Sequence, residues 1–317
     1  MTRPVLIDTD PGIDDAMAIA FAALAPELDL VAITTVAGNA TIAQTTHNAL
    51  ALSEVLGIDV PVARGAGCAL SGRAVDPPTF VHGDDGLGDT NPRVAAKTCD
   101  ERTAAETIVD AAREHDGRLT IVALGQLTNL ALALRLDPDL AERVDELVVM
   151  GGAFGFGSFG GNVTPVAEAN MHGDPLAADI VCGANWSMSI VGLDVTMQTI
   201  MTASLRERMR TVSDTGRYLY DVSTFYDRFY RDRHGLDGFP VHDSSAVAQL
   251  LDPSLFEHDA GPVRVVTGGV AAGQTVLVAA DVAASYVGWQ DRPALTVCRS
   301  VNASALLERF LDTIGRG

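Results

Sequence analysis

The stretch "LIDTDPGIDDAMAIAFAAL" at residues 6–24 places several carboxylates where a short apolar run gives way to an apolar segment with helical spacing. Asp14 and Asp15 fall in the first turn of the expected helix, where acidic side chains interact favourably with the helix dipole. That interpretation leaves Asp8 and Asp10 unexplained, because they lie on the expected buried strand and at its end. Neighbouring carboxylates repel one another unless they are protonated or share a cation. An all-oxygen cluster suits Ca²⁺ or Mg²⁺ better than zinc, so the stretch favours a site for a hard cation.

Short apolar runs alternate with helical stretches along most of the chain, which indicates a parallel sheet covered on both faces. The sequence therefore predicts one α/β domain over residues 1–317, with a mostly parallel, Rossmann-like open sheet flanked by helices. Ligands of such sheets bind beyond the carboxyl ends of the strands, which is where Asp10 is expected. The expected strands are residues 4–8, 28–36, 118–124, 145–152 and 187–194, with further strands near 263–267 and 275–279 and a closing helix at 302–314.

Three segments interrupt this alternation. Residues 66–93 and 151–175 read as long loops, and residues 200–238 as a polar, aromatic-bearing helical insertion. Long loops in a compact domain commonly carry function, so we expect these segments to lie over the active site. The sequence "GFGSFG" at 155–160 matches a dinucleotide-binding pattern literally, but Pro165 and its polar neighbours do not continue as the helix that such a site requires. We interpret it as a flexible loop.

The composition limits the class of partner. A formal net charge of −19 argues against nucleic acid and anionic membranes, and leaves neutral small molecules and cations. The 4 cysteines are widely spaced and have no metal-binding pattern, as in a cytoplasmic protein with reduced thiols. No leader is evident and no apolar run reaches the ~18 residues of a membrane span, so we expect a soluble, cytoplasmic protein.

A second polar cluster occurs in "FPVHDSSAVAQLL" at residues 239–251. Asp243 could simply cap the following helix and His242 could simply lie at the surface. Alternatively, the pair could combine a proton donor with a metal ligand. Tyr226 and Tyr230 are spaced i, i+4 and share one helical face, either as a core stripe or as a stacking wall for a flat ligand. The residues alone leave both choices open.

Several motifs together resemble one known family, the inosine–uridine-type nucleoside hydrolases. "DTDPGIDDA" is similar to the amino-terminal signature of that family. The likeness continues, in order, through "TTVAGNA" (34–40), "HGDDGLG" (82–88), "ALGQLTNLALAL" (123–134), "VVMGGA" (148–153), "GNVTPVAEANMHGDP" (161–175) and "VHDSSAV" (241–247). The resemblance implies a calcium-dependent hydrolase that cleaves the N-glycosidic bond of a small-molecule ribonucleoside to ribose and free base. It also implies a homo-oligomer, either a dimer or a tetramer.

The resemblance assigns roles position by position. The implied Ca²⁺ ligands are Asp10, Asp15, Asp243 and the backbone carbonyl of Leu124, with Asp10 also the general base for the metal-bound water. The implied ribose contacts are Asp14, Asn39, Met150, Asn162, Glu168 and Asn170. The implied neighbours of the base are His82, Tyr226, Tyr230 and His242, with His242 as the proton donor to the leaving base.

Other functions compete with this interpretation. Asp8 and Asp10 at the end of a first strand could serve a haloacid-dehalogenase-type phosphatase, but that chemistry needs a lysine and the chain contains only Lys97. A non-catalytic nucleoside- or cation-binding protein of the same fold is a further alternative, as is a hydrolase of a modified nucleoside. Ala169 stands where the family commonly has an aromatic residue, which leaves substrate identity open, including the choice between purine and pyrimidine.

Overall fold

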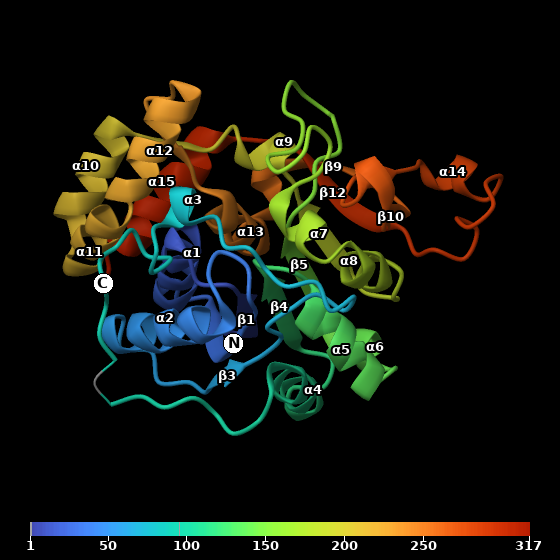
Figure 1. Cartoon of the computed structure of the whole chain (residues 1–317), viewed down its shortest axis with the longest axis horizontal. Coiled ribbons are helices and arrows are strands. Elements are labelled where there is room, and N and C mark those ends of the chain that lie inside the picture. Colours follow the sequence, from blue (N-terminus) through green and yellow to red (C-terminus); the bar gives the residue numbers. More distant parts are fainter. Residues whose placement is uncertain (1, 95) are drawn as a thin grey trace.

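A mixed sheet of eight strands forms the centre of the protein (Figure 1). The computed structural model describes residues 2–94 and 96–317. The strands pair in the order β3-β2-β1-β4-β5-β6-β12-β9, and all neighbours are parallel except β9, which runs antiparallel to β12 at one edge. Their bounds are Arg3–Thr9 (β1), Leu28–Thr35 (β2), Val62–Arg64 (β3), Leu119–Ala123 (β4), Val144–Met150 (β5), Met188–Val191 (β6), Phe256–Gly261 (β9) and Leu295–Val301 (β12).

Helices cover both faces of this sheet, as the strand–helix alternation predicts. One face carries α1 (Ile13–Leu24), α2 (Ile42–Val55), α13 (His242–Leu251) and α15 (Ala303–Ile314). The other carries α4 (Ala104–Glu114), α5 (Thr128–Leu136), α6 (Leu140–Arg143) and α8 (Pro175–Cys182).

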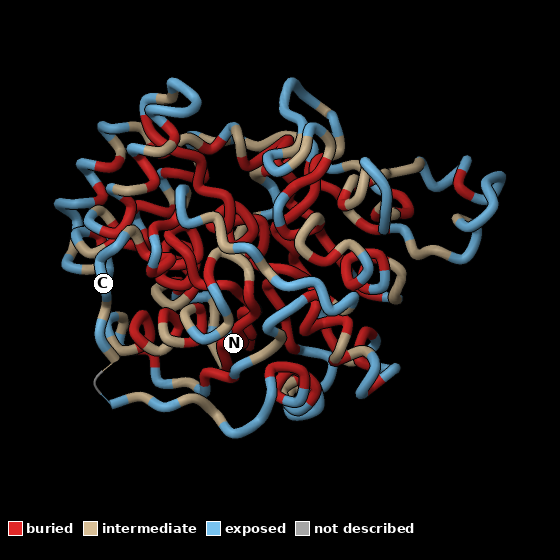
Figure 2. The backbone as a smooth tube through the Cα atoms, in the orientation of Figure 1, coloured by how far each residue is buried: buried red, intermediate tan, exposed pale blue. Residues whose placement is uncertain are grey.

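Successive residues of a strand point to opposite faces. Val5 and Ile7 therefore pack into the core beside α1, and Leu6 packs into the core beside α4. Figure 2 shows that the buried backbone gathers in the sheet and its covering helices, while exposed backbone lies at the periphery.

The expected helical insertion is present at the carboxyl ends of the strands. Between β7 (Ile200–Thr202) and β8 (Gly238–Pro240), which pair with each other, the chain forms α10 (Ala203–Val212), α11 (Asp214–Val222) and α12 (Thr224–His234). The first long loop carries the short helix α3 (Thr79–His82), and the second carries α7 (Ala169–Gly173). Helix α3 packs on α12, so the first loop and the insertion meet over the same end of the sheet.

The carboxyl-terminal part departs from the expectation. The strands expected near 263–267 and 275–279 exist as β10 (Val263–Val265) and β11 (Thr275–Leu277), but they form a separate two-stranded ribbon. With α14 (Ala280–Ala283) this ribbon belongs to an arm that projects to the right in Figure 1. The main sheet is completed instead by β9 and β12, whose mixed exposure hides the continuous apolar run that marks the inner strands. Among the described residues, no helix has the length and apolar character needed to cross a membrane.

Candidate active site

The carboxylates identified in the sequence come together because two helices begin at the same place. Asp10 follows the end of β1, and α1 begins at Ile13, so Asp14 and Asp15 lie in its first turn. Helix α13 packs on α1 and begins at His242, which puts Asp243 in its first turn. One oxygen from each of Asp14, Asp15 and Asp243 lies within 4.8 Å of the others. This trio contains Asp14 where the family resemblance implies Asp10.

Asp8 is neutralised differently from its neighbours. Its Oδ1 accepts hydrogen bonds from Thr34 Oγ1 at 2.6 Å and Asn129 Nδ2 at 2.8 Å. Burial raises the pKa of Asp8 to about 6, against the opposing effect of these two bonds. Asp8 Oδ1 therefore has donors of its own, from β2 and from α5, while Asp8 Oδ2 has no partner among the described residues. Asp8 is not among the cavity-lining residues.

Asn39, which follows the adjacent strand β2, connects the carboxylates of Asp10 and Asp15. Its backbone N–H donates to Asp10 Oδ2 at 2.8 Å, and its side-chain Nδ2 donates to Asp15 Oδ2 at 2.9 Å. Asp15 also accepts from the Thr9 hydroxyl and from the backbone N–H of Gly12. Asp15 is thus bonded through both of its oxygens, and one oxygen of Asp10 is fixed in place.

In the cluster of Asp10, Asp14, Asp15 and Asp243, two of the buried carboxylate oxygens are unbonded. Within the described residues, neither Asp10 Oδ1 nor Asp14 Oδ1 has a hydrogen-bond partner. A Cβ on Gly125 would lie 2.6 Å from Asp10 Oδ1, so this oxygen faces the backbone that directly follows Leu124. An unpaired buried polar atom is costly, and a charged one more so. Both oxygens are therefore suited to a ligand that carries positive charge.

The electrostatics of the cluster support the same conclusion. Burial raises the pKa of Asp10 and Asp243 well above the ordinary value, and neighbouring carboxylates raise both further. Burial also raises the pKa of Asp14 to about 8, with a further contribution from the charge of Asp15. A buried cluster of carboxylates whose negative charges repel one another in this way is suited to bind a hard divalent cation.

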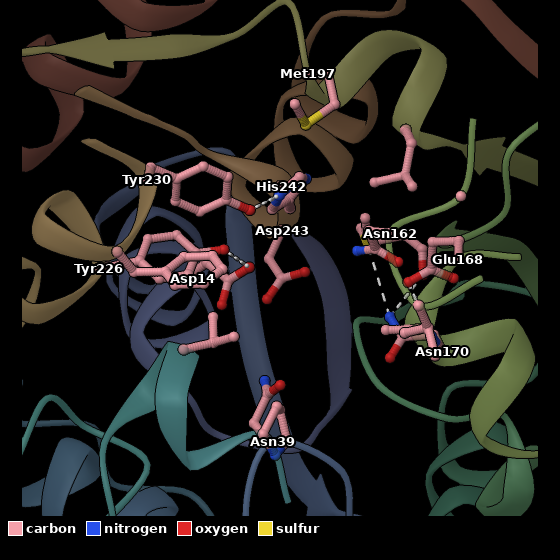
Figure 3. A pocket seen from close by; sticks show the side chains of 18 of the residues that line it. Asp14, Asn39, Asn162, Glu168, Asn170, Met197, Tyr226, Tyr230, His242 and Asp243 are labelled. Carbon is pink, nitrogen blue, oxygen red and sulfur yellow. Dashed lines mark hydrogen bonds between the residues drawn. The ribbon is translucent and has the colours of Figure 1, made fainter. Parts of the chain in front are cut away.

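A cavity of about 410 Å³ opens above these carboxylates (Figure 3). Its wall contains residues that follow the carboxyl ends of parallel strands, as expected for such a sheet. In Figure 3 the two tyrosines lie on one side of Asp14 and Asp243, and Asn162, Glu168 and Asn170 lie on the other. Asp10 and Asp15 are the predicted site residues outside the lining; the predicted residues within it are Asp14, Asn39, His82, Leu124, Met150, Asn162, Glu168, Asn170, Tyr226, Tyr230, His242 and Asp243.

The aromatic side of the cavity is a connected network. The Tyr226 hydroxyl donates to Asp14 Oδ2 at 3.4 Å, and the Tyr230 hydroxyl lies 2.9 Å from His242 Nε2. The two tyrosine rings meet edge to face with centroids 4.9 Å apart. His82 packs on Tyr226 with ring centroids 5.4 Å apart. Burial lowers the pKa of His242 to about 4 and that of His82 to about 3.

The opposite side is organised by a helix cap. Glu168 precedes α7, and its carboxylate accepts from the backbone N–H groups of Asn170 at 2.8 Å, Met171 at 3.1 Å and Gly152 at 2.9 Å. Asn170 Nδ2 in turn donates to the Leu124 carbonyl at 2.6 Å. Glu168 therefore fixes the backbone that presents Asn170, in addition to any contact with a ligand.

Sequence reasoning missed the short helix α9 (Leu193–Thr196). Leu193 lines the cavity, while Asp194 accepts the backbone N–H groups of Phe154 and Phe156, both at 2.7 Å. Asp194 thereby anchors the glycine-rich loop whose residues 158–163 line the cavity. Asp194 is the last residue of the strand expected at 187–194, of which Met188–Val191 is strand, and a polar residue at the carboxyl end of a buried strand was the available signal. The cavity wall also contains Phe80, Met197, Phe229 and His234, none of which the sequence pattern singled out.

The fold and the site define the class of protein. A solved plant nucleoside hydrolase superposes with a TM-score of 0.95, at 37% identity over 99% of each chain. The model of the inosine-uridine preferring nucleoside hydrolase family matches residues 5–308, and the chain belongs to this family.

Curated relatives agree with that assignment. A probable uridine nucleosidase 2 of Arabidopsis thaliana is 39% identical over 98% of this chain and 97% of its own length. An inosine-uridine preferring nucleoside hydrolase of Leishmania major is 39% identical over 87% of this chain and 88% of its own. The protein is therefore a hydrolase that acts on N-glycosyl compounds, with nucleoside hydrolase function.

Proposed function

We propose that the protein hydrolyses the N-glycosidic bond of ribonucleosides to ribose and free base, with Ca²⁺ as cofactor and Asp10 as general base. The observation that carries the proposal is the position of unbonded buried carboxylate oxygens beneath a cavity whose wall presents His242 and two tyrosines. A cation-dependent base and a proton donor then face one substrate from different sides. The acidic site also favours neutral nucleosides over their phosphates.

The candidate Ca²⁺ ligands are Asp10, Asp15, Asp243 and the Leu124 carbonyl. When bound, such an ion acidifies water and orients the hydroxyl groups of the sugar. A set with Asp14 in place of Asp10 is the second candidate, since Asp14 belongs to the carboxylate trio that the structure brings closest together. In either set the donors are oxygens, which suits Ca²⁺.

The residues of the chain divide the reaction between two sides, as in inverting glycosidases. Asp10 Oδ1 accepts a proton from water as the water oxygen forms its bond to C1′ of the ribose. The bond from C1′ to the base nitrogen breaks, and its electron pair leaves with the base. The departing base takes a proton from the His242 side of the cavity. Negative charge on that base favours the protonated imidazole, which offsets the effect of burial on the pKa of His242.

Polar groups on the remaining walls hold the sugar. Asp14 and Asn39 lie beside the carboxylate cluster, and Asn162, Glu168 and Asn170 lie across the cavity. A site built around hydroxyl groups discriminates against a substrate that lacks one, because buried polar groups then stay unpaired. Ribonucleosides are accordingly favoured over their 2′-deoxy forms.

We expect release of reducing sugar from one or more of uridine, cytidine, inosine, adenosine and guanosine in the presence of Ca²⁺, with the 2′-deoxy forms poor. Thorough chelation with EGTA should abolish this activity, and added Ca²⁺ should restore it. Activity that survives chelation would remove the cation from the proposal. Binding of nucleosides without any turnover would favour a non-catalytic binding protein of the same fold. Turnover restricted to modified nucleosides would favour a hydrolase of a modified nucleoside.

The raised carboxyl pKa values predict how the cation affects stability. The pKa of Asp14 rises from its ordinary 3.8 to about 8 in the folded, cation-free protein, so across this window the folded state binds more protons than the unfolded state. The free energy of unfolding of the cation-free protein therefore falls as pH rises through the window. Bound Ca²⁺ favours the ionised carboxylates, so the increase in Tm caused by Ca²⁺ should grow with pH. Thermal scans of the metal-stripped protein with and without Ca²⁺, at several pH values and matched ionic strength, measure this increase in Tm. An increase that does not depend on pH would contradict the prediction.

The expected dimer or tetramer stays a prediction, which light scattering of the purified chain can test. The expected cytoplasmic location is likewise a prediction.

A further inference from the structure

A buried threonine contacts the inner side of His242. Thr196 Oγ1 lies 2.7 Å from His242 Nδ1, and both residues are buried. The other ring nitrogen, Nε2, is bonded to the Tyr230 hydroxyl and so faces the aromatic side of the cavity. The imidazole is thus held at both nitrogens, from α9 on one side and from α12 on the other.

The backbone around this contact is fixed as well. Thr199 Oγ1 donates to the Thr196 carbonyl at 2.7 Å and lies 3.1 Å from Ser245 Oγ. The backbone N–H of Val241, directly before His242, donates to the Thr199 carbonyl at 3.0 Å. The segments that carry Thr196 and His242 are therefore tied together independently of the side-chain contact.

We propose that Thr196 is a positioning residue for proton delivery to the leaving base: its hydroxyl fixes the His242 ring so that Nε2 faces Tyr230 and the cavity. The proposal rests on the proposed function, because it assumes that His242 supplies that proton. In the described part of the chain, Thr196 is the recorded hydrogen-bond partner of Nδ1.

A hydroxyl is well suited to this place. Its oxygen can accept from Nδ1–H both before and after Nε2 releases a proton, because that transfer leaves the Nδ1 proton in place. A carboxylate could also accept, but it would add another buried negative charge against His242, the residue that directly precedes Asp243. A methyl in place of the hydroxyl would leave a buried ring nitrogen without a partner.

The test compares two substrates that differ in their need for a proton. A nucleoside base leaves slowly unless it is protonated, whereas p-nitrophenolate leaves as an anion from p-nitrophenyl β-D-ribofuranoside. In Thr196→Val we expect kcat for the best ribonucleoside to fall by about 10- to 100-fold, the cost of an unpaired buried ring nitrogen. We expect KM and the turnover of the aryl riboside to stay within about twofold.

Three variants control the comparison. Thr196→Ser keeps the hydroxyl and should recover most of the nucleoside turnover. Thr46→Val removes a buried hydroxyl whose partners are Thr35 and the Ile42 carbonyl rather than His242 or Thr196, and should keep the wild-type ratio of the two substrates. In a His242→Ala background, Thr196→Val should cause no further loss, because residues that act through one group are not additive. If Thr196→Val does not fold, Thr196→Ala replaces it in every comparison.

The possible outcomes distinguish failure of the role proposed for Thr196 from failure of the proposed hydrolase function. Equal loss on both substrates, no loss on either, or a full additional loss in the His242→Ala background would each overturn the role of Thr196. Failure of the wild-type protein to hydrolyse any ribonucleoside would instead overturn the proposed function.

Discussion

Asp10→Asn should lower kcat for ribonucleosides by about 10³-fold at saturating Ca²⁺, because a positioned general base contributes roughly 10² to 10⁴ to the rate. The amide can still accept the Asn39 N–H that Asp10 Oδ2 accepts, so the loop keeps its anchor. The group that faces Gly125, however, can no longer take a proton. Steady-state kinetics give the loss in turnover, and calorimetry gives the affinities for Ca²⁺ and for nucleoside.

Asp8→Asn is the matched control. Asp8 is also a buried carboxylate on the first strand, but its donors are Thr34 and Asn129, whereas Asp10 accepts from Asn39 and faces Gly125. We expect this variant to keep kcat within about threefold of wild type. Equal losses in the two variants would show that the effect comes from the buried strand rather than from proton transfer. Unchanged turnover in Asp10→Asn would exclude Asp10 as the base and favour the ligand set with Asp14.

The second large effect is expected at the other side of the substrate. His242→Ala should lower kcat for ribonucleosides by about 10²- to 10³-fold, since the variant removes the imidazole that faces Tyr230 and the leaving base. The loss should be greatest for nucleosides whose base most needs protonation by the enzyme. Comparison of purine with pyrimidine nucleosides, and of both with the aryl riboside, measures this dependence.

His258→Ala serves as the control for loss of an imidazole. His258, on the outer strand β9, bonds Gln249 of α13 and is not among the cavity-lining residues. Its replacement should leave turnover of every substrate close to wild type. A small and equal effect of His242→Ala on purine and pyrimidine nucleosides would remove His242 from the mechanism.

Much of the architecture follows from local patterns. The inner strands β1, β2, β4, β5 and β6 are apolar runs followed by helical stretches, so their order along the chain and their parallel direction could be predicted. The separate ribbon of β10 and β11 and the sheet edge formed by β12 and β9 could not. Pairing of β12 with β6 joins segments about a hundred positions apart, and nothing local distinguishes it from pairing with the nearer ribbon.

The candidate site shows the same division. The motifs that contain Asp14, Asp15 and Asp243 predict polar groups at the starts of helices. These groups are expected to meet because the strands are parallel and ligands bind at the carboxyl ends of such strands. The cavity brings nearly all of the predicted residues together. The sequence could not show that Asn39 connects Asp10 to Asp15, or that Glu168 caps α7. Such contacts depend on side-chain directions set by packing.

The sequence by itself determined the class of fold and the acidic character of the site, and its resemblance to a family supplied candidates for a base, a proton donor and cation ligands. Residue types and the spacing of motifs are properties that a chain carries before it folds. The tertiary structure decided which donors each carboxylate has: Asp8 is bonded from Thr34 and Asn129, Asp10 from Asn39 and Asp14 from Tyr226, and one oxygen of each lacks a partner among the described residues. It also placed Thr196 against His242. The physical reason is that hydrogen bonds and electrostatic effects act over a few ångströms in space, and only packing decides which distant residues come that close.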